Sequence, residues 1–151
     1  MANGTFTLHR WNGVEQFPVS AVCITTYPER GQVAVCIEVE AARPPVSTLP
    51  DTEPLAATPN AEFTFLRPPA SALDLLGFDC LISSGAVEGE WVARLYYASH
   101  EALDGVSISF PEARGLDLRF KASGHCPDVC HHGSKPSTRL EIDAWFRSPA
   151  P

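Results

Sequence analysis

Two alternating segments joined by a short turn limit the possible folds of this chain. Residues 19–27 and 32–40 alternate apolar side chains with other types, and the sequence Pro-Glu-Arg-Gly at 28–31 lies between them. Proline suits the first position of a turn, and glycine tolerates the left-handed backbone at its end. The segment therefore predicts a β-hairpin.

The register of this hairpin follows from the length of the turn. If Tyr27 faces Gln32, one face of the hairpin is continuously apolar and Cys23 lies opposite Cys36. We interpret these cysteines first as small thiols compatible with a sheet, and only second as a redox pair.

A second hairpin is predicted at residues 106–110 and 116–120, around a turn at 111–115. Pairing Phe110 with Leu116 places the apolar side chains on one face and the serine and charged side chains on the other. One face of this ribbon is therefore expected to contact water.

Other alternating segments extend the same pattern to the whole chain. Each predicted hairpin has a strand before it, and a long loop followed by another strand after it; the four additional strands are 5–11, 62–67, 90–98 and 138–146. The loops are 41–60, which is rich in proline, and 122–137.

This recurrence predicts an internal repeat of 4–67 and 89–147. The linker, 68–88, begins with Pro-Pro-Ala-Ser-Ala-Leu-Asp-Leu-Leu, which favours one short helix over 68–76, with Ser71 as a candidate N-cap. Eight strands and one short helix predict an all-β domain spanning 1–151. The expected architecture is a Greek-key-like β-sandwich or a partly closed barrel.

The charge balance limits the class of partner. The chain has 18 acidic and 11 basic residues, a formal net charge of −7. This charge disfavours nucleic acid and anionic membranes, and a basic or neutral protein partner fits better. The N-terminus lacks the features of a secretory signal, so we expect a cytoplasmic protein.

One loop carries residues suited to metal binding. Three histidines and two cysteines fall within eight positions, and they are candidate metal ligands: His125, Cys126, Cys130, His131 and His132. Zinc or copper would be the expected ion. The spacing is not that of a structural zinc site, because both cysteines lie in one loop with a three-residue gap and no second ligand pair follows.

Three other interpretations of this loop stay open. It could be a solvated loop with incidental thiols, or contain a Cys126–Cys130 disulfide, which a reducing compartment would disfavour. It could also supply a cysteine nucleophile activated by a neighbouring histidine, with Asp128 orienting that histidine.

A tryptophan on a polar strand face suggests a binding surface. Trp145 alternates with Arg139, Glu141 and Asp143, so it should share their side of the strand. A tryptophan among charged residues is a candidate for an interface.

The sequence favours a binding protein over an enzyme. It contains no phosphate-binding loop, dinucleotide fingerprint, nucleophile elbow or zinc-protease motif. We therefore expect a non-enzymatic binding or interaction domain, with a metal-binding protein or metalloenzyme that uses residues 125–132 as the alternative. A homodimer, through an edge strand or the Trp145 face, is compatible with both.

Overall fold

The structure is a computed structural model that describes residues 3–11, 13–43, 58–82, 86–87, 90–97, 99–127 and 137–149. The strands, in chain order, are β1 (Asn3–Arg10), β2 (Gly13–Glu29), β3 (Gln32–Ala41), β4 (Asn60–Arg67), β5 (Asp79–Ile82), β6 (Ala86–Val87), β7 (Glu90–Trp91), β8 (Ala93–Tyr97), β9 (Ser99–Ala102), β10 (Asp104–Ser109), β11 (Ala113–Arg114), β12 (Asp117–Pro127) and β13 (Ser137–Arg147).

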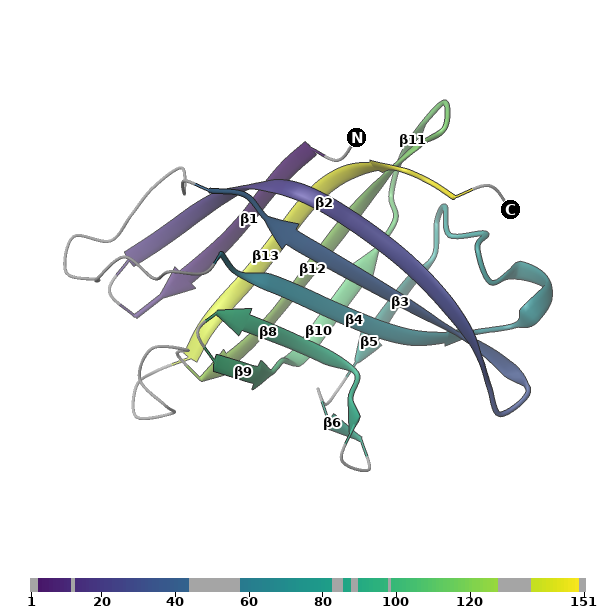
Figure 1. Ribbon diagram of the computed structural model, residues 1–151, viewed down its shortest axis with the longest axis horizontal. Helices are drawn as coiled ribbons and strands as arrows, with labels where there is room; N and C mark the ends of the chain where they lie inside the picture. Colours follow the sequence, from purple (N-terminus) through teal and green to yellow (C-terminus); the bar gives the residue numbers. More distant parts are fainter. Residues whose placement is uncertain are drawn as a thin grey trace.

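The main sheet is antiparallel and strongly curled, and it forms a half-barrel (Figure 1). Its strand order is β5-β10-β12-β13-β1-β2-β3-β4-β8-β9, while β11 pairs with β12 and β6 pairs with β7 in a separate ribbon. The first and last long strands, β1 and β13, are neighbours. The prediction of an all-β, partly closed barrel is confirmed.

The long strand β2 forms the corner between the two walls of the half-barrel. Its first half pairs with β1 from Gly13 to Pro18, and its second half pairs with β3 from Val19 onward. The register shifts between Val19 and Ala21, which is the signature of a β-bulge. A bulge bends a strand and increases its twist, so β2 can belong to both walls.

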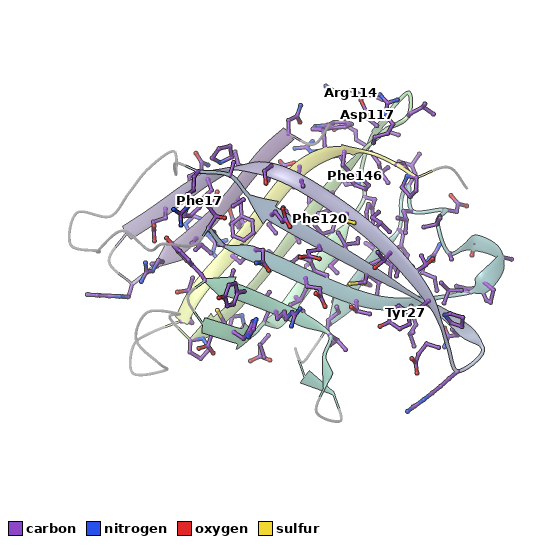
Figure 2. The ribbon with its side chains drawn as sticks, viewed as in Figure 1. Phe17, Tyr27, Arg114, Asp117, Phe120 and Phe146 are labelled. Carbon is purple, nitrogen blue, oxygen red and sulfur yellow. The ribbon has the colours of Figure 1, made fainter. Side chains whose placement is uncertain are left out.

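The inner face of the half-barrel holds the hydrophobic core. Phe63 on β4 contacts Phe120 on β12 edge-to-face, with 5.7 Å between the ring centroids, and Phe65 packs against Phe110 at 6.4 Å. These pairs join walls that are distant in the strand order, and Figure 2 shows Phe120 between them. The buried face of β13 is the predicted one: Leu140, Ile142, Ala144 and Phe146.

A buried ion pair lies at one end of this core. Nη1 of Arg10 donates to Oε1 of Glu15 at 2.7 Å, and the two side chains are 1% and 4% exposed. The hydroxyl of Tyr97, on β8, donates to Oε2 of the same glutamate at 3.1 Å. Both strands of the β1–β2 hairpin are thereby joined to β8.

The first predicted hairpin is present, but the predicted register was wrong by two residues. Tyr27 faces Ala34, so Cys23 lies opposite Glu38 and Cys36 opposite Thr25. The cause is a tighter turn than expected: the last pair is Glu29 with Gln32, and only two residues form the turn. A two-residue shift keeps every side chain on its predicted face.

The second hairpin also differs in register, by four residues. Ile108 pairs with Ala122 instead of Leu118. The turn is longer than predicted because Ala113 and Arg114 fold back as β11 and pair with Leu118 and Asp117. The shift is again even, so the predicted faces are preserved.

The connections differ most from expectation. A single 3-10 turn, Pro69–Ser71, stands where a helix over 68–76 was predicted, and its N-cap is Pro68, not Ser71. The expected Greek-key return after β3 is also absent from the described strands, because β3 pairs directly with β4. No helix in the described part of the chain has the length and hydrophobicity of a membrane span.

Candidate functional site

The outer face of one wall is polar across five neighbouring strands: β10, β12, β13, β1 and the first half of β2. The strand register aligns the side chains of this face in three cross-strand rows. These are Ser109-Lys121-Asp143-Thr5, Ser107-Ser123-Glu141-Thr7-Gln16 and His125-Arg139-His9-Val14. Side chains opposite each other in an antiparallel pair lie close enough to act on one ligand.

A hollow of about 620 Å³ lies on this face, and we call it the polar groove. Its lining comes from all five strands and is mainly polar: Thr5, Thr7, His9, Val14, Gln16, Ser107, Ser109, Lys121, Ala122, Ser123, Glu141, Ile142 and Asp143. The volume falls within the range of about 300–1,000 Å³ that is usual for small-molecule sites, but such sites are mostly apolar. The groove therefore suits a hydrophilic ligand.

The aspartate of the groove is held by an arginine beside it. Arg119 donates from Nε to Oδ1 of Asp143 at 2.8 Å and from Nη2 to Oδ2 at 2.7 Å. Its Nη1 donates to Glu112 at 2.8 Å. The hydrogen bonds from Arg119 lower the pKa of Asp143. The same bonds, together with the one to Glu112, raise the pKa of the arginine. Asp143 is therefore a paired carboxylate rather than one awaiting a cation.

The glutamate of the groove also has partners. Arg139 Nη1 contacts Oε1 of Glu141, and Nε2 of His9 lies 3.2 Å from Oε2. Nε2 of His9 has no hydrogen-bond partner among the described residues.

Neutral hydroxyl groups supply most of the remaining polar atoms. Thr7 is buried and accepts a hydrogen bond from Nε2 of Gln16 at 3.2 Å. Within the described residues, the structure gives no side-chain hydrogen bond for Thr5, Ser107, Ser109 or Ser123. A hydroxyl can both donate and accept, so these groups can bind a ligand in either sense.

Trp145 lies on the outer face, in the row Arg119-Trp145-Asn3 next to the groove. It is half-buried, and the guanidinium of Arg114 lies 4.5 Å from the centroid of its ring. Figure 2 shows Arg114 and Asp117 together at this end of the wall. The alternation predicted this face correctly, whereas a role for Trp145 in binding stays a prediction.

The predicted metal loop is partly a strand. Residues 124–127 belong to β12, which pairs with β13 through Pro127. His125 is exposed on the outer face and packs against Gly105, whereas Cys126 is 1% exposed on the inner face. Consecutive residues of a strand point to opposite sides, so these two do not face one ion together.

The other predicted ligands, Cys130, His131 and His132, lie outside the described residues, as does Asp128. Among the residues that are described, no group of three or more potential metal ligands gathers. Metal binding therefore stays a prediction.

Comparisons with known proteins found no matching family model, no matching curated protein and no matching solved structure.

Sequence reasoning identified Trp145 and its polar face but not the groove. Glu141 and Asp143 were named only as its neighbours, and Thr7, Ser123 and Lys121 were not singled out. Alternation places each of them on an outer face, which was the available signal. Their convergence depends on β1 and β12 both pairing with β13, and no local pattern encodes that pairing.

Proposed function

We propose that this protein is a non-enzymatic binding domain whose ligand occupies the polar groove. The observation that carries the proposal is a hollow of about 620 Å³ lined by hydroxyl, amide and charged side chains from five strands. A surface that served only to face water would not need such a hollow. Both carboxylates of the groove are paired with arginines, which favours binding over catalysis.

The charges around the groove favour a neutral ligand over a strongly basic one. The chain as a whole carries −7, but the two groove carboxylates are paired with Arg119 and Arg139. Lys121 and His9 add positive or titratable groups to the lining. The net charge of the chain is compatible with a basic or a neutral partner, and the groove favours a neutral one.

A ligand screen with matched variants tests this proposal. Ser123 lies in the middle row between Ser107 and Glu141, so Ser123→Tyr should fill the groove while keeping a side chain suited to strands. Thr25→Tyr, at an exposed position on the other wall, is the control. The measurement is the rise in melting temperature caused by members of a hydrophilic compound library.

Compounds that stabilise the wild-type protein should stabilise Thr25→Tyr equally and should lose their effect on Ser123→Tyr. Ligands that stabilise all three proteins alike would place the binding surface elsewhere. A screen without any stabilising compound would count against a binding function for the groove.

The border of the groove has its own test. Trp145→Ala should leave the fold intact, because the ring is not part of the core, and it should weaken binding of the same compounds. Unchanged binding would remove Trp145 from the site while leaving the groove itself in place.

A further inference from the structure

We propose that the ligand of the polar groove is a neutral carbohydrate, an inference that rests on the proposed binding function and specifies its ligand. The first argument is the kind of polar atom on offer. Hydroxyl groups of Thr5, Thr7, Ser107, Ser109 and Ser123 line the groove, with the amide of Gln16 beside them. A sugar presents the same chemistry, since each of its hydroxyls both donates and accepts.

Second, both carboxylates of the groove are already paired with arginines of the protein. Arg119 holds Asp143 with two hydrogen bonds, and Glu141 lies between Arg139 and His9. A charged ligand would have to compete with these contacts and lose its own hydration. A neutral ligand can instead accept from Lys121 and bond to the outer edges of the carboxylates without displacing either arginine.

The third argument is the shape of the site. The middle row crosses five strands, from Ser107 to Gln16, and adjacent strands lie about 4.8 Å apart. The groove thus offers polar groups at regular steps over roughly 19 Å. Such regular steps suit a chain of repeating, similarly hydroxylated units better than a single compact molecule.

The fourth argument is the aromatic ring at the border. Trp145 occupies the row next to Asp143, and Arg114 stacks on its ring at 4.5 Å. Tryptophan combines a broad apolar surface with one polar N–H group. A sugar ring that extends beyond the groove would pack its apolar C–H face on this indole in place of the Arg114 guanidinium that lies over it.

The test is a binding measurement with defined sugars on the intact chain. Isothermal titration would use cellopentaose, maltopentaose, xylopentaose and chitopentaose as neutral probes, and a polygalacturonate oligomer and a lysine pentapeptide as charged ones. We expect at least one neutral probe to bind. Its affinity should be unchanged between about 0.05 and 0.5 M salt, because no net charge is neutralised on binding.

Variants that remove hydroxyl groups connect the binding to the groove. The combined change Thr5→Val, Ser107→Ala and Ser123→Ala should weaken the neutral probe about tenfold or more, since each lost hydrogen bond contributes modestly. The control Thr25→Val with Thr64→Val removes hydroxyls from the opposite wall. It should leave the affinity unchanged, and circular dichroism would show that both variants fold.

Two results would overturn the inference: no neutral probe binds, or a bound neutral probe is indifferent to the hydroxyl changes in the groove. Binding of only the charged probes, lost at high salt, is one form of the first result and would reject a neutral carbohydrate. If another ligand binds the wild type and is blocked by Ser123→Tyr, the proposed binding function stands although the carbohydrate inference fails. If Ser123→Tyr blocks no ligand, both fail.

Discussion

At the scale of single residues, the buried pair of Arg10 and Glu15 is the least expected feature of the core. Alternation along β1 and β2 points both side chains inward, together with Leu8 and Phe17. Charged residues near a hairpin turn are nevertheless usually exposed, so the burial of this pair could not be predicted from local pattern. The acceptor for the hydroxyl of Tyr97 could not be anticipated either, since it lies 82 positions away.

Removing one member of this pair should be costly. Glu15→Gln leaves the charge of Arg10 buried without its carboxylate, and breaking such a pair costs about 3–5 kcal/mol. Urea unfolding measures the change. Asp117→Asn is the matched control, because its pair with Arg147 is exposed and should contribute less than about 1 kcal/mol. Equal effects of the two changes would contradict the buried pair.

The Arg119–Asp143 pair should make the free energy of unfolding depend on pH in the acid range. The pKa of Asp143 is lowered in the folded protein, because Arg119 donates hydrogen bonds to its carboxylate. The contribution of this pair to the free energy of unfolding is therefore complete above about pH 3.9, the pKa of an aspartate in the unfolded chain. It is lost as the pH falls through the lowered pKa of Asp143.

Arg119→Gln should accordingly be less stable than the wild type at neutral pH. The difference should narrow in acid as the pH falls through the lowered pKa of Asp143, because the carboxylate is then protonated and loses its attraction to Arg119. Thermal unfolding at a series of pH values measures it, and a difference that stays constant into acid would show that the pair does not act through this ionisation.

At the scale of elements, the alternating segments located the strands and their faces, while the turns decided the register. All eight predicted strands have counterparts, and the two hairpins are present with even shifts. The first shift arises at Arg30, whose φ of 50° precedes a φ of 79° at Gly31. Two positive values make a two-residue turn of the hairpin type, which arginine rarely adopts and the sequence therefore did not reveal.

This turn offers a stabilising substitution. Arg30→Asn places a residue that tolerates positive φ at the first turn position, and it should raise the free energy of unfolding by about 0.5–1 kcal/mol. Gly31→Ala should lower it by about 1 kcal/mol through backbone strain alone, because the space around Gly31 is open. Denaturant titration compares the two variants, and a neutral or destabilising effect of Arg30→Asn would argue against the two-residue turn.

At the scale of the whole molecule, the pairing of β1 with β13 could not be inferred from local patterns. Composition and alternation indicate an all-β chain, and hydrophobic faces indicate a barrel or sandwich. Which strands become neighbours depends on contacts between residues more than a hundred positions apart, such as Thr7 with Glu141. The polar groove exists because of that pairing, so its residues were visible in the sequence while the site was not.

The same pairing gives the molecule two unlike outer walls. The wall that carries the groove combines hydroxyls with paired carboxylates, and the opposite wall presents Glu38 and Glu62 side by side with Arg94 bound to the latter. A ligand that is neutral and rich in hydroxyls is therefore expected on the first wall only.

Binding in the polar groove can be located by mapping the amide chemical-shift changes of the labelled protein during titration with the neutral oligosaccharides. We expect the shift changes to cluster around Thr7, Ser123 and Glu141 in the middle row and to extend towards Trp145. Shifts confined to the opposite wall around Thr25 and Glu62, or no shifts with any ligand of the panel, would contradict the assignment of the groove as the binding surface.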